Sequence, residues 1–183
     1  NPAQSLPDQN RVHEALQAAE CVVLQEAFAD TETAAYADVL LPAATWGEQD
    51  GTMTNSERCI SRVHASVPPP GEARADWEIV TAFARRLMPE QGDRLFPYVS
   101  AEAVFNEHRE TTRGRDLDIT GLSYSLLDSA PQQWPFPEGA TTGEARLYAD
   151  GVYPTDSGRA RFHAAPYRPV AEAIDARYPL HLN

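Results

Sequence analysis

Short apolar segments alternate with polar ones along the first part of the chain, and their spacing predicts alternating helices and strands. Residues 7–19 repeat apolar side chains at helical spacing, beginning at Pro7 or Asp8. Two short apolar runs, 21–24 and 39–41, are bounded by polar residues or proline, which is typical of strands buried on both faces of a parallel sheet. Residues 30–37 predict a short helix between them. Helix followed by buried strand is half of a βαβ unit and indicates an α/β fold.

The clearest helical pattern covers residues 77–87, directly after Asp76. Its apolar stripe comprises Trp77, Val80, Phe83, Ala84 and Leu87. Pro89 ends this helix. Residues 101–109 predict a further helix with Ser100 as its N-cap. Residues 59–64 alternate between apolar and polar side chains, which fits either a strand or an extended arm.

Glycine and proline interrupt the pattern from residue 110 to residue 145. We expect irregular surface structure there, with a helical turn near 123–128 and Trp134 anchoring the segment by burial. Residues 146–149 and 161–164 predict the two arms of a β-hairpin. Residues 178–182 predict one more strand.

These elements predict an α/β, Rossmann-like fold: a mostly parallel sheet flanked by helices, followed by an irregular C-terminal arm and β-hairpin. We place one domain at 1–110 and the arm and hairpin at 111–183. The chain begins at Asn1 rather than Met, and no strand precedes the first helix. We therefore expect an internal fragment of a longer protein.

The chain is acidic and contains no lysine. Its 15 basic residues are all arginine and face 27 acidic ones, which gives a formal net charge of −12 over 183 residues. This balance argues against nucleic acid and anionic membranes as partners. No apolar run reaches the length of a membrane span. We expect a cytoplasmic protein.

Cysteine and histidine show no pattern of metal ligands. Cys21 opens an apolar run, where a buried small side chain is expected, and Cys59 lies far from it. The five histidines are scattered. Neither an iron–sulfur nor a zinc site has enough ligands. A glycine-rich phosphate loop is also missing.

Polar side chains crowd into the loop that follows the run 39–41. Trp46, Glu48, Gln49, Asp50, Asn55, Glu57 and Arg58 lie there, between and beyond glycines 47 and 51. Loops at the carboxyl ends of parallel strands bind ligands in open α/β sheets. An ordinary polar connection explains the composition equally well.

Four motifs, in order, resemble those of a known family. Residues 37–58, ADVLLPAATWGEQDGTMTNSER, are similar to a signature of the molybdopterin oxidoreductases, the dimethyl sulfoxide reductase superfamily. Asn1-Pro2, PPGEARADW at 69–77, and GRARF with YPLHLN at 158–183 agree with it. The resemblance covers nearly the whole chain. It is strongest to the assimilatory nitrate reductase catalytic subunit, with formate dehydrogenase next.

The resemblance implies a molybdenum cofactor carried by two molybdopterin guanine dinucleotides, and a 4Fe-4S cluster in the parent chain outside this fragment. The cluster cysteines and the molybdenum ligand of the family lie upstream. This fragment is therefore expected to hold no catalytic residue and no metal ligand, and to be inactive alone. Residues 1–110 would form part of a guanine dinucleotide site.

Five residues match cofactor-binding positions of the family: Asn1, Gln25, Glu26, Gln49 and Asp76. By resemblance, Asn1 lies near the pterin, Gln25 and Glu26 contact the nucleotide from a strand end, and Asp76 reads guanine. Gln49 stands where lysine is common. Two of these residues have a second interpretation. Glu26 suits a solvated strand end, and Asp76 suits a helix N-cap. Trp46, Glu48, Asn55 and Glu57 are expected to fix the loop.

The resemblance also implies partners and leaves the substrate open. Nitrate would be reduced to nitrite by oxygen-atom transfer to molybdenum, with electrons from a donor protein or subunit, and the remaining domains of the parent enzyme would surround this one. The first alternative is a formate dehydrogenase alpha subunit. The second is a non-catalytic scaffold domain, like that of the large iron–sulfur subunit of complex I. Acidic and amide residues such as Glu26, Asn55 and Asp76 favour an enzyme over the scaffold.

Overall fold

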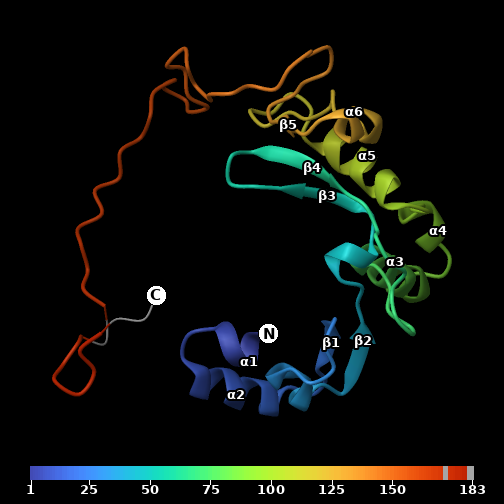
Figure 1. Cartoon of the computed structure of the whole chain (residues 1–183), viewed down its shortest axis with the longest axis vertical. Helices are drawn as coiled ribbons and strands as arrows, with labels where there is room; N and C mark the ends of the chain where they lie inside the picture. Colours follow the sequence, from blue (N-terminus) through green and yellow to red (C-terminus); the bar gives the residue numbers. More distant parts are fainter. Residues whose placement is uncertain (171–172, 181–183) are drawn as a thin grey trace. The chain divides into compact units, whose positions relative to one another are not determined.

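The computed structural model describes residues 1–170 and 173–180 (Figure 1). The chain divides into two compact units, Asn1–Ala145 and Arg146–Asn183. No described helix is long and apolar enough to cross a membrane.

The first unit begins with a small α/β segment. Its elements are α1 (Pro2–Ser5), α2 (Gln9–Ala18), β1 (Val23–Glu26), the 3₁₀ helix η1 (Glu32–Tyr36) and β2 (Val39–Pro42). Strands β1 and β2 are parallel, with Val23 opposite Val39 and Glu26 opposite Pro42. The mixed α/β class with a parallel strand pair is confirmed, and so are the helix at 7–19 and the short helix at 30–37.

A three-stranded antiparallel sheet follows the parallel pair. The 3₁₀ helix η2 (Trp46–Glu48) leads into β3 (Gly51–Thr54), which pairs with β4 (Cys59–Val63), and β4 pairs with the short β5 (Gln132–Gln133). Of the two structures predicted for residues 59–64, a strand or an extended arm, the strand is found, whereas β3 lies where the sequence predicted only a loop. A turn at Asn55–Arg58 reverses the chain, with Arg58 at φ 67°. Among the described residues, the sheet is therefore less parallel than expected.

Four helices complete the first unit. They are α3 (Asp76–Leu87), α4 (Gly92–Leu95), α5 (Ala101–Thr111) and α6 (Tyr124–Ser129). Ser100 caps α5 by accepting a hydrogen bond from the Ala103 backbone N–H at 3.1 Å, as predicted. Ser123 caps α6 in the same way through Leu126, at 3.2 Å. The helical turn expected near 123–128 is confirmed as α6.

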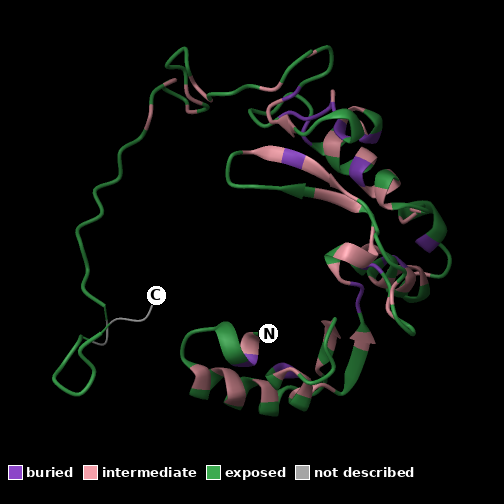
Figure 2. Cartoon of the chain, in the orientation of Figure 1, coloured by how far each residue is buried: buried purple, intermediate pink, exposed green. Residues whose placement is uncertain are grey.

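Most residues of the main apolar core belong to the segment 110–145, for which the sequence predicted irregular surface structure. Figure 2 colours the chain by burial, with buried residues in purple. The buried members of this core are Ile60, Phe105, Ile119, Leu122, Tyr124, Leu127 and Phe136. Trp134 packs against this cluster while half-buried. Irregular backbone therefore contributes much of the core, because loop side chains fill the space between β4, α5 and α6.

The parallel pair and α3 are more exposed than their apolar sequences predicted. Val23 and Val39 retain 58% and 43% of their accessible surface, so these strands are not buried on both faces. Phe83 on α3 is 63% exposed. Cys21 is also exposed, in contrast to the buried position expected. The apolar pattern predicted these strands and this helix correctly, but no described part of the chain buries their apolar side chains fully.

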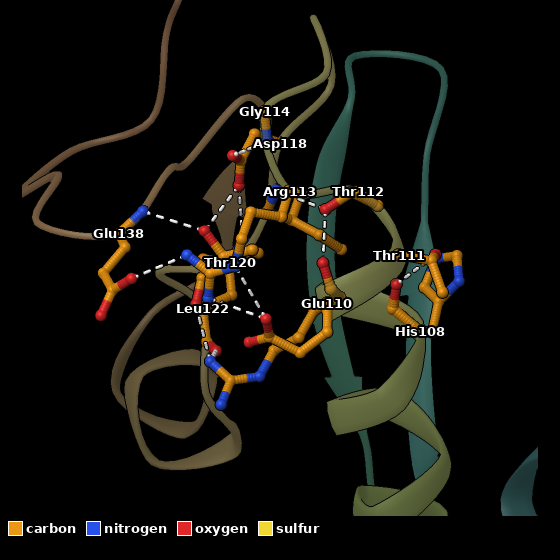
Figure 3. Close-up of polar contacts among 12 residues, drawn as sticks. His108, Glu110, Thr111, Thr112, Arg113, Gly114, Asp118, Thr120, Leu122 and Glu138 are labelled. Carbon is orange, nitrogen blue, oxygen red and sulfur yellow. Dashed lines mark hydrogen bonds and ion pairs between the residues drawn. The ribbon is translucent and has the colours of Figure 1, made fainter.

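Backbone and side-chain hydrogen bonds hold the irregular segment after α5 (Figure 3). Asp118, which is 8% exposed, accepts hydrogen bonds from the Gly114 N–H at 2.8 Å, the Thr120 N–H at 2.8 Å and the Thr120 hydroxyl at 2.6 Å. Arg109 Nη1 donates to the carbonyls of Thr120 and Leu122 at 2.7 and 2.8 Å. These bonds satisfy backbone groups that no helix or sheet accounts for.

The second unit has no helix or strand among its described residues. The hairpin arms predicted at 146–149 and 161–164 are therefore wrong. Local bonds take the place of strand pairing, because the Thr155 hydroxyl accepts from the Arg159 N–H at 3.1 Å and donates to the Arg159 carbonyl at 2.9 Å. Residues 178–180 form no strand, and the end of that prediction, residues 181–182, lies outside the described residues.

Candidate functional site

The carboxyl ends of β1 and β2 meet the start of α3. The Glu26 carbonyl, at the end of β1, accepts a hydrogen bond from the Ala43 N–H at 3.1 Å. Beyond β2, the Ala44 N–H donates to the Arg74 carbonyl at 2.8 Å, and the Arg74 N–H donates to the Pro42 carbonyl at 3.2 Å. These bonds fix the first residues of α3 beside the strand ends, at the edge where α/β sheets bind ligands.

Gln25 and Asp76 are joined at this edge, although 51 residues separate them. The Gln25 side-chain amide, on β1, donates a hydrogen bond to Asp76 Oδ1, at the first residue of α3. Gln25 is half-buried and Asp76 is exposed. A carboxylate offers about four acceptor sites, so the bond from Gln25 leaves Asp76 able to accept others. The structure thus brings two of the five predicted residues into contact.

Asp76 is not the N-cap of α3, so that interpretation is wrong. The N-cap is Ala75, and Glu78 completes a capping arrangement by accepting a hydrogen bond from the Ala75 N–H at 3.1 Å. Asp76 is instead the first helical residue, and among the described contacts its carboxylate accepts the side-chain amide of Gln25.

Asn1 and Glu26 both accept hydrogen bonds within the first α/β segment. Asn1 Oδ1 accepts from the Thr33 hydroxyl at 2.5 Å and from the Thr33 N–H at 3.3 Å, which ties the start of the described chain to η1. Thr33 is 2% exposed and also accepts from the Ala3 N–H at 3.1 Å. Glu26 is half-buried, and its Oε1 accepts from the Ala27 N–H at 2.9 Å. Both side chains therefore shape the backbone near the strand ends.

Gln49 lines a separate cleft of about 440 Å³. Four carboxyl side chains line it as well, from Glu48, Asp50, Glu78 and Glu102, together with one guanidinium, that of Arg62. Gln49 Nε2 lies 3.5 Å from the Ala44 carbonyl, a long hydrogen bond. An excess of negative charge around Gln49 does not favour a phosphate group beside it.

Arg62 has a structural role that the sequence analysis does not predict. Its guanidinium lies 3.7 Å from the centre of the Tyr124 ring, pairs with Asp128 at 2.9 Å and donates to the Gly51 carbonyl at 2.6 Å. The side chain is 9% exposed. It holds β4 against α6, and the alternating pattern of β4 contains no signal for such a role because the partners are distant in sequence.

Two of the motif residues that are expected to fix the loop, Glu48 and Asn55, accept hydrogen bonds from its backbone. Glu48 Oε2 accepts from the Thr45 N–H at 2.8 Å and caps η2. Asn55 Oδ1 accepts from the N–H groups of Glu57 and Cys59 at 2.9 and 3.0 Å. Trp46, by contrast, is 72% exposed. Glu48 and Asn55 thus fix the loop.

Charge at the start of α3 indicates which chemical group suits this edge. The first turn contains Asp76 and Glu78, both acidic. A helix N-terminus attracts anions, but two carboxylates already occupy this one, so a phosphate is disfavoured here. A neutral group that donates N–H bonds suits the Asp76 carboxylate. Among residues 1–170 and 173–180, no cluster of three or more His, Cys, Asp or Glu side chains is arranged to hold a metal.

Comparison with known proteins relates the chain to one family of redox enzymes. Residues 1–86 match the family described as molybdopterin oxidoreductase. Over the whole chain, the sequence is 43% identical to nitrate reductase of Synechocystis sp., 40% identical to assimilatory nitrate reductase of Haloferax mediterranei and 40% identical to the F420-dependent formate dehydrogenase subunit alpha of Methanocaldococcus jannaschii. The chain spans 26% of the length of each of these relatives.

A solved structure has a similar fold. Acetylene hydratase from Pelobacter acetylenicus superimposes with a TM-score of 0.55 at 23% sequence identity, over 82% of this chain and 19% of that one. At this identity the likeness concerns the fold alone.

Proposed function

We propose that this chain, whose residues 1–86 match the model of the molybdopterin oxidoreductase family, is part of a molybdenum-dependent nitrate reductase catalytic subunit. Its role there is to contribute one wall of a guanine dinucleotide cofactor site. The parent enzyme reduces nitrate to nitrite in the cytoplasm, takes electrons from a donor protein or subunit, and holds a 4Fe-4S cluster outside this chain.

The contact between Gln25 and Asp76 is the observation that carries this proposal. Guanine presents two neighbouring donors, N1–H and the N2 amino group, and a carboxylate accepts both. Such charge-assisted hydrogen bonds contribute roughly 1.5–3 kcal/mol each. Asp76 is exposed, has no capping role and lies at the strand-end edge of the parallel pair. These properties suit a residue that reads a base.

The other predicted residues take supporting places in this proposal. Asn1 and Glu26 shape the strand-end edge near the pterin and the ribose, and Gln49 is an amide that suits a neutral polar group better than a phosphate. The bound cofactor supplies the redox chemistry, and this chain binds and orients it. No residue of the chain is assigned a catalytic role, and the chain by itself is expected to be inactive.

Formate oxidation is the second candidate for the parent enzyme. A formate dehydrogenase subunit is 40% identical over the whole chain, close to the 43% and 40% found with nitrate reductases. Gln25 and Asp76 would have the same role in a nitrate reductase and in a formate dehydrogenase. The structure around these two residues therefore does not distinguish the two candidates.

The test uses the purified full-length parent, analysed for molybdenum and iron and assayed for nitrate reduction and formate oxidation with an artificial electron carrier. Molybdenum with nitrate turnover is expected. Formate turnover without nitrate turnover would show that formate is the substrate, and it would leave the proposed cofactor unchanged. Iron without molybdenum, and no turnover, would overturn the proposal and favour a scaffold.

A variant of the same parent tests the site. Asp76→Ala is expected to lower the amount of guanine nucleotide released from the denatured protein per mole of polypeptide. The exposed residue Asp30 supplies the control, as Asp30→Ala. Equal nucleotide content in the wild type and both variants would show that Asp76 does not hold the base.

A further inference from the structure

We infer that Gln25 is a specificity-determining residue that reads guanine O6 while Asp76 reads the two neighbouring donors; this inference rests on the proposed function. The starting point is the hydrogen bond from Gln25 Nε2 to Asp76 Oδ1. It sets an amide and a carboxylate side by side at the open edge of the parallel pair.

The chemistry of the two side chains gives a distinct pattern. A glutamine amide nitrogen carries two N–H groups, and a carboxylate only accepts. Because one N–H of the Gln25 side-chain amide donates to Asp76, its second N–H can donate to a ligand. The pair therefore offers a donor next to a set of acceptors. Guanine presents the complementary order along its Watson–Crick edge: the O6 acceptor, the N1–H donor and the N2 amino donor.

Other bases do not match this order. Adenine presents its N6 amino donor where guanine has O6, and an acceptor at N1, which would face the Asp76 carboxylate. Cytosine presents its N4 amino donor and then the two acceptors N3 and O2. A polar group that is left facing another acceptor loses its hydrogen bond and is penalised when water is excluded. The Gln25–Asp76 pair thus selects guanine over adenine and cytosine.

A purely structural role for the Gln25–Asp76 bond is less well supported. Backbone bonds between Arg74 and the segment Pro42–Ala44 already fix α3 at the strand ends. Glu78 already accepts the Ala75 N–H at the start of this helix. Gln25 is half-buried and Asp76 is exposed, so neither side chain is a buried group that requires a partner. The contact is therefore available for recognition.

The test measures equilibrium binding of nucleotide monophosphates to the full-length parent protein prepared without cofactor. The probes are GMP, 6-thio-GMP, IMP and AMP. The sulfur of 6-thio-GMP is a weaker acceptor than O6, and IMP lacks only the N2 amino group. Wild-type protein is expected to bind GMP best, and each of the other three probes about tenfold or more weakly, as expected for loss of one hydrogen bond to a charged or amide partner.

The variant Gln25→Leu distinguishes the contribution of Gln25 to guanine recognition from that of Asp76. It is expected to abolish the preference for GMP over 6-thio-GMP and to leave the ratio of GMP to IMP binding unchanged, because Asp76 still reads the N2 amino group. Gln25→Glu is expected to weaken GMP binding further, since a carboxylate would face O6. Gln17→Leu, an exposed position on α2, is the control and should change neither ratio.

Each outcome is informative. A wild-type protein that binds GMP and AMP equally well would overturn the proposed base site itself. A wild type that prefers GMP, combined with a Gln25→Leu variant that keeps its full discrimination against 6-thio-GMP, would overturn only the role of Gln25. Uniform weakening of all four probes in Gln25→Leu would assign Gln25 a structural role and overturn the inference. Gln25→Asn, which keeps the amide, is measured if Gln25→Leu does not fold.

Discussion

Asp118 is the side chain whose ionisation we expect to matter most for stability. Three hydrogen bonds from Gly114 and Thr120 favour the charged carboxylate and hold the pKa of Asp118 below its usual range, with the Thr120 hydroxyl as the largest cause. A carboxyl group whose pKa is lower in the folded state stabilises the fold above its unfolded pKa and loses that contribution as the pH falls through its folded pKa. The contribution of Asp118 is therefore complete at neutral pH.

Asp118→Asn is predicted to lower the free energy of unfolding by about 1–3 kcal/mol near pH 7, because two backbone N–H groups lose a charged acceptor. The difference from wild type should shrink as the pH falls below about 4, the usual pKa of aspartate. Denaturant unfolding of both proteins between pH 7 and pH 3 checks this. Asp30→Asn, at an exposed position, serves as the control. A difference that stays constant with pH would show that the charge of Asp118 is not responsible.

Single residues of the candidate site were only partly predictable from sequence. Asp76 and Gln25 are predicted from their resemblance to cofactor-binding positions, and the structure brings these two residues together. Their contact was not predictable, because it depends on how the start of α3 docks on the strand ends. The N-cap interpretation of Asp76 is wrong because α3 begins at Asp76 itself, which makes Ala75 the N-cap.

At the scale of elements, the β3–β4 hairpin depends on the turn that Asn55 organises. Asn55→Ala is predicted to lower the free energy of unfolding by about 1–2 kcal/mol, because the N–H groups of Glu57 and Cys59 lose their acceptor. Asn55→Asp keeps an acceptor oxygen and should cost less. Chemical denaturation of the two variants and the wild type measures the difference. Equal stability of Asn55→Ala and wild type would show that water replaces the side chain without loss.

The apolar stripe of α3 provides a second prediction for an element. Phe83 is 63% exposed and Leu87 is 67% exposed, so polar substitutions there should change the free energy of unfolding of this chain by no more than about 0.5 kcal/mol. Phe105→Ala, at a buried position of similar chemistry, should cost about 3–5 kcal/mol. Thermal and denaturant unfolding of Phe83→Ser, Leu87→Ser and Phe105→Ala tests the contrast. A large loss in Phe83→Ser would mean that the stripe is buried in solution.

Elements with strong periodicity were predicted better than those defined by pairing. Helices α2, α3 and α5 follow from apolar spacing and from caps such as Ser100. Strand β3 has the sequence Gly-Thr-Met-Thr, which contains little apolar signal, and it exists because the turn at Asn55 brings it against β4. The hairpin expected in the second unit had the right residue types, but the local bonds of Thr155 took precedence over pairing.

At the scale of the whole molecule, the sequence identified the fold class but not the location of the core. Composition and periodicity placed the apolar interior around the strands at 21–24 and 39–41. The structure places most of it around Leu122 and Phe136, in a segment rich in glycine and proline. Periodicity carries no information about the core residues Ile119, Leu122 and Phe136, because residues in irregular backbone reach the interior through tertiary contacts rather than through a repeating pattern.

This placement of the core makes the boundary between the parts of the chain testable. The compact unit extends to Ala145, whereas a domain ending at residue 110 would stop within α5. Truncation after residue 145 is predicted to leave the cooperative unfolding transition and its free energy within about 0.5 kcal/mol of the full chain, because every residue of the described core cluster precedes residue 146. The chain 1–145 also keeps the Ala145 carbonyl that Arg58 binds.

Truncation after residue 110 is predicted to abolish cooperative unfolding, because five of the seven residues of the core cluster lie beyond that point: Ile119, Leu122, Tyr124, Leu127 and Phe136. Loss of several buried large side chains at about 2–5 kcal/mol each exceeds the usual 5–15 kcal/mol stability of a domain. Circular dichroism and denaturant unfolding of the chains 1–110, 1–145 and 1–183 measure this directly. A cooperative transition in the chain 1–110 would mean that these residues fold without this core, and would support the domain boundary that the sequence predicts.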